Sequence, residues 1–453
     1  ASGLAHVVSI SGLHMSLVAG GFFWIIRGVL ALSEHLALRK PIKKWAAAAA
    51  LLAGAIYLAL SGCEVPTQRS YIMLAIMFAA VLVGRPALSL RNVALAAIFA
   101  MILDPAAVLQ PGLQMSFLAV TGLLSFFEAR RMERAAPGTG SRGGWIRQGV
   151  TRLAISLLTL ALTTVIAGIC TGPPAAYHFG RVSPYSLIGN LLALPVISSI
   201  VMPMALAGTV LMLVGLEDFP FAIMHVGLKS VMAISDWTAG LPGARFFVPG
   251  QTALSAVTMS AGILYTCLVL TAARWLGVVI FAVGLVLAPL APRPDILIER
   301  TARNVAIRNA AGELVVAHPR RSRFAVERWL IADGDDASPM ESAARAGWRC
   351  SEHVCLALVK DKRIAFAQAE AEGKLICPAA DILVASFPLR KSCSNIPLRI
   401  DRFDVWRMGA YALFINGSGI RTQTARSVRG ARPWVTEPRA RKTRPPGRSM
   451  AAQ

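Results

Sequence analysis

Long apolar segments separated by short polar ones dominate the first two thirds of the chain. A membrane-spanning helix needs about 20 mostly apolar residues. Several segments approach this length, so the pattern predicts a polytopic α-helical membrane protein with about 8–10 spans. The candidate spans are residues 11–32, 45–61, 67–84, 91–110, 112–128, 152–171, 187–214, 221–239, 252–272 and 275–291.

Two of these segments contain residues that disturb a simple span. Pro195 and Pro203 interrupt the helical hydrogen-bond ladder of segment 187–214. Segment 221–239 contains His225, Lys229 and Asp236, which favours a membrane-surface position or a wet cavity. We therefore expect a break in the first segment and a partly solvated helix in the second.

After residue 292 the pattern changes to short apolar runs that are typical of strands. They predict a small α/β domain over residues 293–415, with a helix over 339–346 that Ser338 caps and Pro339 begins. Nine basic residues, one Glu and four Pro over residues 416–453 predict a disordered basic tail. The expected strands are 296–299, 304–308, 313–317, 328–332, 354–359, 363–367, 381–386, 399–406 and 410–415.

Composition supports this division of the chain. The 453 residues are 55% apolar and 15% charged, which excludes a wholly soluble protein and extensive disorder. Residues 1–292 carry 18 basic and 8 acidic residues, and residues 293–453 carry 28 and 16, within a total of 46 and 24. A membrane body is thus joined to a water-facing part. The sequence starts at Ala1 without a basic leader, so we expect it to begin inside a longer protein.

The charges of the connecting loops predict an orientation. Loops 33–44, 85–91 and 129–152 carry net charges of +3, +2 and +5. The alternate loops 62–70, 104–113 and 172–186 carry 0, −1 and +1. Positively charged loops stay in the cytoplasm, so the first set is expected inside and the second outside.

Polar stretches then gather toward the outer side. They are residues 9–14, 66–70, 111–116 and 177–190. Polar groups at membrane depth usually face a cavity or one another, so we expect a shared polar vestibule. The alternative is that they hydrogen-bond neighbouring helices together. The candidate residues are Ser11, His14, Gln68, Arg69, Gln114, His178, Arg181 and Asn190.

Motifs for catalysis or nucleotide hydrolysis are missing from the sequence. It has no HExxH, CxxC or P-loop spacing. Ser11 and His14 have no carboxylate placed to orient the His. We expect no catalytic residue, metal or cofactor in the membrane body, and an energy source outside the chain.

Four ordered motifs resemble the ComEC competence family of DNA-uptake channels. The first is Ile10-Ser11-Gly12-Leu13-His14, and the second is Gln68-Arg69-Ser70. Asp104-Pro105 leads into Gly112-Leu113-Gln114-Met115-Ser116-Phe117, and Arg181-Val182-Ser183-Pro184 leads into Asn190 to Pro195. The resemblance covers residues 1 to about 290. It implies a multi-pass inner-membrane protein that passes single-stranded DNA into the cytoplasm during natural transformation.

The resemblance also implies partners and a further domain. A cytoplasmic ATPase motor and a periplasmic DNA receptor are expected, and a homo-oligomer stays open. The family's C-terminal metallo-β-lactamase-like domain needs a His cluster, but only His318 and His353 follow residue 293. We therefore expect a degenerate domain without nuclease activity. The turn Asp333-Gly334-Asp335-Asp336 is interpreted as a solvated turn rather than a metal site.

Four cysteines lie in this C-terminal part. Ten crossings from an outside start place the domain in the periplasm, where thiols oxidise. The spacing then favours disulfides Cys350–Cys355 and Cys377–Cys393. A Cys₄ zinc site and free thiols in a cytoplasmic domain remain alternatives. For the whole chain, a permease for another solute is the alternative function.

Overall fold

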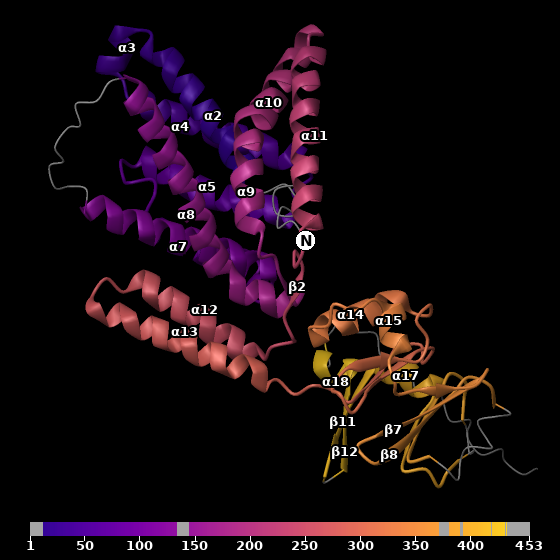
Figure 1. The fold of residues 1–453 in the computed structure, drawn as a ribbon. Coiled ribbons are helices and arrows are strands. Elements are labelled where there is room, and N and C mark those ends of the chain that lie inside the picture. The colour runs from indigo at the N-terminus through magenta and orange to yellow at the C-terminus, as the bar shows by residue number, and fades with distance from the viewer. Residues whose placement is uncertain are drawn as a thin grey trace, which may run out of the picture. The chain divides into compact units, whose positions relative to one another are not determined.

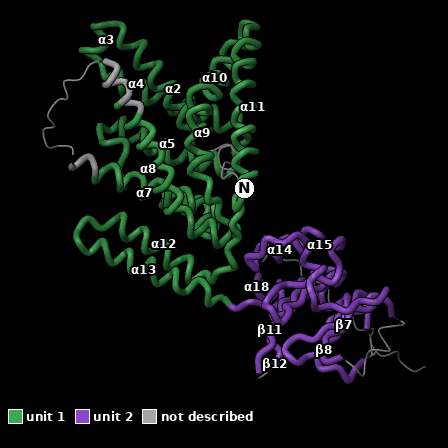
Figure 2. Tube along the Cα trace, in the orientation of Figure 1, with its two compact units in different colours: residues 1–291 green, residues 292–453 purple. Residues whose placement is uncertain are grey.

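The computed structural model describes residues 12–133, 145–370, 380–389, 393–417, 419–430 and 432. The chain forms two compact units, residues 1–291 and 292–453 (Figure 2). The division falls where the charged fraction of the sequence rises. Each unit is described by itself below.

The first unit is helical (Figure 1). Among the residues that the structure describes, seven helical segments are long and apolar enough to cross a membrane. Large apolar side chains cover their outer faces; for example, Leu52 is 64% exposed and Leu158 is 67% exposed. Such faces are stable against lipid rather than water. The segments are His14–Ala31, Ile42–Leu60, Val65–Leu82, Pro111–Ala129, Ala154–Phe179, Ser186–Val214 and Ala272–Leu290.

The remaining expected spans form helices of other kinds. Leu90–Leu103 and Ala253–Leu268 are shorter apolar helices. Helix α11 covers Asp218–Gly240 and includes the charged residues noted above. In chain order the elements are α2 Gly12–Ala31, α3 Glu34–Arg39, α4 Ile42–Leu60, α5 Val65–Leu82, α6 Leu90–Leu103, η1 Pro105–Leu109, α7 Pro111–Glu133, α8 Trp145–Phe179, β1 Arg181–Val182, α9 Ser186–Val196, η2 Ile197–Val201, α10 Met202–Leu211, η3 Met212–Val214, α11, β2 Phe246–Phe247, α12 Ala253–Leu268, η4 Ala272–Arg274, α13 Trp275–Leu287 and η5 Ala288–Leu290.

Segment 187–214 does not break at its prolines, in contrast to the expectation. It stays helical through a π-helical turn, η2, between α9 and α10. The backbone N–H of Met202 donates to the carbonyl of Ile197, five residues earlier. Pro203 has no N–H to donate, so the wider turn absorbs the missing bond without ending the helix.

Small residues let α12 and α13 pack closely as a hairpin (Figure 1). A Cβ added at Gly262 would lie 2.5 Å from the backbone nitrogen of Phe281. The hydroxyl of Ser255 donates to the carbonyl of Gly284 at 2.8 Å. Close backbone approach and an interhelical hydrogen bond replace the hydrophobic effect, which is weak between helices in lipid.

The second unit contains two five-stranded sheets. Their strand orders are β10-β9-β8-β7-β6 and β12-β11-β3-β4-β5. Buried side chains from both sheets, including Ile298, Val305, Phe366 and Val384, form one shared core. The strands are β3 Ile296–Ile298, β4 Val305–Arg308, β5 Leu314–Val316, β6 Arg349–Cys350, β7 Val354–Val359, β8 Lys362–Ala367, β9 Ile382–Ala385, β10 Leu398–Ile400, β11 Tyr411–Asn416 and β12 Gly419–Thr424.

Two expected strands of this unit are wholly or partly helical instead. Residues 328–332 belong to helix α14, Arg323–Asp333, because buried Val326 and Leu330 are four residues apart on one helical face. The expected strand 399–406 ends early, since Asp401 caps helix α17, Arg402–Met408, by accepting from the backbone of Phe403 and Asp404. The expected helix is present as α15, Pro339–Ala344, with Ser338 as its cap.

The first part of the expected tail is ordered, and residues 433–453 lie outside the described residues. Strand β12 and helix α18, Ala425–Arg429, occupy its first part. Asn416 pairs with Gly419, so the loop is the two residues Gly417-Ser418, a hairpin signal that the high charge of the segment obscured. Arg421 of β12 lies over the ring of Phe414 on β11, with 4.4 Å between its guanidinium carbon and the ring centroid.

Arginines pair with two of the three carboxylates at the end of α14, so the turn expected to be solvated is largely ion-paired. Asp333 accepts from Arg308 at 2.6 Å, and Asp335 accepts from Arg345 at 2.5 Å. Burial raises the pKa of Asp335, but hydrogen bonds from Arg345 and Ala337 outweigh it and leave that pKa below its ordinary value. These ion pairs give Asp333 and Asp335 a structural role.

A disulfide joins Cys350 of β6 to Cys355 of β7, which face each other in the ladder. Cys393 is also disulfide-bonded. Cys377, the partner expected for it, lies outside the described residues.

Candidate functional site

The polar stretches of the membrane unit lie at helix ends that contact one another. Residues 12–14 of the first stretch begin α2, stretch 66–70 lies in the first turns of α5, and stretch 111–116 begins α7. Stretch 177–190 covers the end of α8, β1 and the first half of α9. The contacts below join the four stretches in a row.

The first contact joins α2 to α5. A Cβ added at Gly12 would lie 3.5 Å from the hydroxyl oxygen of Ser70. That hydroxyl donates to the carbonyl of Pro66 at 2.9 Å. His14 is half-buried in the first turn of α2, whereas Ser11 lies outside the described residues.

The second contact joins α5 to α7. The guanidinium of Arg69 lies against Gly112, where an added Cβ would be 2.5 Å from the terminal nitrogen Nη2. A larger residue at position 112 would displace the Arg69 guanidinium from the start of α7. Arg69 Nε and Thr67 Oγ1 are buried and have no hydrogen-bond partner among the residues that the structure describes.

The third contact joins α7 to α8. The amide nitrogen of Gln114 donates to the carbonyl of Val108 at 2.8 Å. Its oxygen, Oε1, is 3.0 Å from Nε2 of His178. An amide oxygen only accepts, so His178 donates from Nε2 and its imidazole is fixed in that tautomer when neutral.

The fourth stretch is held by the segment that follows α11. Strand β1 pairs with β2, so that Arg181 faces Phe247. The backbone of Val248 donates to the carbonyl of Gly180 at 3.0 Å. The hydroxyl of Tyr185 donates to the carbonyl of Pro242 at 2.8 Å. This short sheet fixes the chain between α8 and α9.

Three candidate residues, described next, take no part in the contacts that join the stretches. Gln68 is exposed and donates to the carbonyl of Cys63 at 2.6 Å, toward the connection between α4 and α5. Arg181 is exposed. Asn190 is buried in α9, and its side-chain oxygen has no hydrogen-bond partner in the described part of the chain.

Thr67 and Gly112 lie within the predicted polar stretches, but sequence reasoning did not single them out as candidate residues. Thr67 is fully buried at the start of α5, where its position beside Gln68 and Arg69 was the available signal. Gly112 matters through the neighbour it admits, and no local pattern shows that neighbour. Asp104 also supports this end, because its carboxylate accepts from the Ala106 backbone at 3.0 Å and from Gln110 at 3.2 Å.

A family comparison covers the region that holds these motifs. The family model described as Competence protein matches residues 1–273. The chain belongs to the ComEC competence family. The resemblance inferred from the four motifs is confirmed.

Curated relatives of this family member include three bacterial proteins. Competence protein ComA of Neisseria gonorrhoeae is 31% identical over 66% of this chain and 39% of its own length. Uncharacterized protein YcaI of Escherichia coli is 28% identical over 51% and 30%. ComE operon protein 3 of Bacillus subtilis is 25% identical over 46% and 23%. The aligned part of the chain thus spans less than two fifths of each relative. No solved structure matches it.

Proposed function

We propose that the membrane unit forms the path by which single-stranded DNA crosses the inner membrane into the cytoplasm during natural transformation. Membership in the competence family points to DNA uptake. The observation that carries the finer proposal is the row of contacts from Gly12 through Ser70, Arg69, Gly112 and Gln114 to His178. It gathers polar groups at one end of otherwise apolar helices.

A polyanion needs such a region because about 30 Å of hydrocarbon offers it no hydrogen bonds. The unpartnered atoms Thr67 Oγ1, Arg69 Nε and Asn190 Oδ1 favour contact with water or a polar solute. Neutral groups such as Gln114 and His178 bind phosphate weakly. Weak, repeated contacts favour conduction over trapping.

The charge pattern supports an outer position for this end. The positively charged loops include the connections 32–41 and 83–89 and residues 134–144. The polar row lies instead at the helix ends beside the loops of low net charge. We propose that DNA meets the row first and then passes between the spans. The motor and receptor expected from the resemblance belong to this proposal, as does a second copy of the chain.

The second unit is proposed to be a degenerate metallo-β-lactamase-like domain without nuclease activity. Asp333 and Asp335 of its acidic turn are paired with Arg308 and Arg345. The full chain incubated with DNA and Zn²⁺, Mn²⁺ or Mg²⁺ should leave the DNA intact. Metal-stimulated cleavage that disappears in Asp333→Asn or Asp335→Asn would refute this part.

Uptake of labelled DNA tests the main proposal. A competent strain that lacks the gene is complemented with the full chain or a variant, and cytoplasmic label is separated from periplasmic label. His14→Ala, Arg69→Ala and Gln114→Ala should reduce cytoplasmic label while the protein stays in the membrane. Gly172→Ala is the matched control, since nothing lies within 4 Å of an added Cβ there.

The outcomes separate the proposal from its rivals. A parallel loss of protein and label would favour the helix-bonding role of these residues. Normal uptake in the gene deletion would favour a permease for another solute.

A further inference from the structure

Helix α17 of the second unit carries an exposed face of arginines and aromatic rings. Phe403 is 47% exposed and Trp406 is 62% exposed. Arg402 and Arg407 are exposed as well. Residues three and four apart share one side of a helix, so these four side chains form one surface. Val405, 1% exposed, anchors the opposite side in the core.

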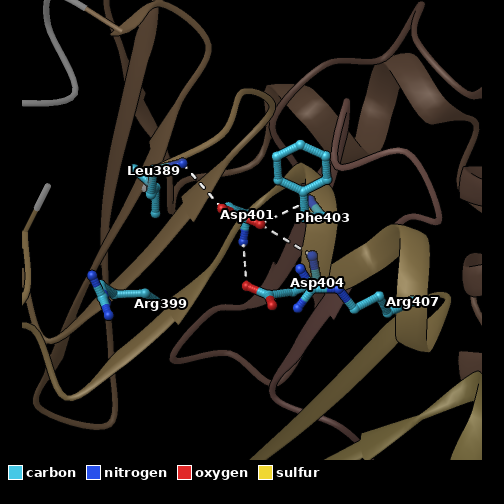
Figure 3. Close-up of a pocket in the computed structure, with 6 residues that line it drawn as sticks. All are labelled: Leu389, Arg399, Asp401, Phe403, Asp404 and Arg407. Atoms are coloured by element: carbon cyan, nitrogen blue, oxygen red, sulfur yellow. Dashed lines mark hydrogen bonds between the residues drawn. The ribbon is translucent and has the colours of Figure 1, made fainter. Parts of the chain in front are cut away.

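A pocket of about 400 Å³ adjoins this face. Arg399 of β10 and Arg407 of α17 lie on opposite sides of Asp401 and Asp404, and Phe403 lies beside Asp401 (Figure 3). Leu389, Asp401 and Asp404 complete the lining. Cationic side chains, an aromatic ring and a recess therefore occur together.

The two carboxylates that line the pocket accept hydrogen bonds from the backbone. Asp401 accepts from the backbone of Leu389 at 3.0 Å, of Phe403 at 2.7 Å and of Asp404 at 3.0 Å. Asp404 accepts from the Asp401 backbone at 3.1 Å. Burial, followed by the neighbouring Asp401 carboxylate, raises the pKa of Asp404. The pocket lining thus combines two arginines with two carboxylates that already accept backbone hydrogen bonds.

We propose that the α17 face, defined as Arg399, Arg402, Phe403, Trp406 and Arg407, binds single-stranded nucleic acid. Arginines pair with successive phosphates, and bases stack on the two rings, as in sequence-tolerant single-strand binders. Charge complementarity favours a polyanion, and exposed rings favour one with unstacked bases. This inference rests on the proposed function, because DNA uptake supplies the strand.

Helix α14 provides a control surface within the same unit. It also exposes an aromatic ring, with Phe324 at 78%. Its Arg323, however, pairs with Glu327 at 2.8 Å. Phe324→Leu and Arg323→Gln therefore change the same chemistry away from the pocket.

Binding of a fluorescent oligothymidylate of about 15 nucleotides to the full chain in zwitterionic nanodiscs tests the inference. Phe403→Leu and Trp406→Leu should each weaken binding about fivefold or more, as loss of one stacked base does. Arg407→Gln should lower the slope of log K against log salt by about 0.7. Equal losses from Phe324→Leu, or no loss from the α17 variants, would overturn the site.

Hydrogen exchange of the α17 amides identifies the occupant. Protection by the oligonucleotide in zwitterionic discs supports the proposal. Protection by phosphatidylglycerol discs alone would assign the face to anionic lipid and overturn it. If α17 variants bind normally while the path variants lose uptake, only this inference fails. If α17 variants lose binding while path variants transport normally, only the proposed function fails.

Discussion

Nε2 of His178 donates to Oε1 of Gln114 across 3.0 Å, and this bond joins α8 to α7 where the polar stretches meet. Gln114 in turn holds the carbonyl of Val108 with its amide nitrogen. One side chain therefore ties the end of α8 to the chain that leads into α7. Each contact of the row can therefore be tested by substituting its two residues singly and together.

Gln114→Ala and His178→Ala should lower DNA uptake to a similar extent, and the double variant should be no worse than either. The reason is that each single change already removes the shared bond. Interhelical hydrogen bonds in membranes contribute ~0.6–1.7 kcal/mol, so both proteins should remain folded. A double-mutant cycle on uptake rate, with protein level measured in parallel, checks the coupling; strictly additive losses would contradict it.

Gly112→Ala should reduce uptake, because the new methyl group would collide with the Arg69 guanidinium. Arg69 has to leave its place across the start of α7, or α7 has to shift. Gly172→Ala adds the same methyl group in α8, where nothing lies within 4 Å, and should leave uptake unchanged. Equal effects of the two changes would show that the fit at Arg69 is unimportant.

The sequence was informative about the spans and much less about their contacts. Apolar length is a local property, so most spans could be read from the chain. The fit of Gly112 to Arg69 depends on which helices become neighbours, which no local pattern encodes. In the second unit, Val326 and Leu330 suit a strand or a helix, and packing on the sheet decided for the helix. Asp401 similarly ended a predicted strand because its cap competes with strand pairing.

The orientation can be tested with a native cysteine. Cys63 is free and exposed at the connection between α4 and α5, where it accepts a hydrogen bond from Gln68. In a Cys63-containing chain whose other free thiols are replaced by Ser, a membrane-impermeant maleimide should label intact cells. With Cys63→Ser and Leu88→Cys, on the 83–89 connection, labelling should require broken cells. The opposite pattern would reverse the proposed orientation.

The thiols of Cys170 in α8 and Cys267 in α12 are hydrogen-bonded to each other, and Ser125 of α7 donates to the Cys267 carbonyl at 2.8 Å. Copper phenanthroline, an oxidant, should therefore link α8 to α12 through a disulfide, with both thiol protons and two electrons passing to the oxidant. A protease cut introduced between these helices would leave the fragments joined until reduction. Cys170→Ser should abolish the link; its persistence, or failure of the native pair to react, would contradict this packing.

Alkylation of the denatured chain will show which side of the membrane the second unit occupies. Cys63, Cys170 and Cys267 are free, whereas Cys350, Cys355 and Cys393 are disulfide-bonded. With Cys377 as the expected partner of Cys393, the chain from native membranes should gain three adducts without reductant and all seven after reduction.

That result needs an oxidising compartment, because cytoplasmic thiols are kept reduced. It would agree with a periplasmic second unit, where the α17 face would meet incoming DNA. Cys350→Ser should raise the unreduced count by one, since Cys355 loses its partner. Seven adducts without reductant would instead place the unit in the cytoplasm or leave its thiols unpaired, and the α17 face would then meet only DNA that has already crossed.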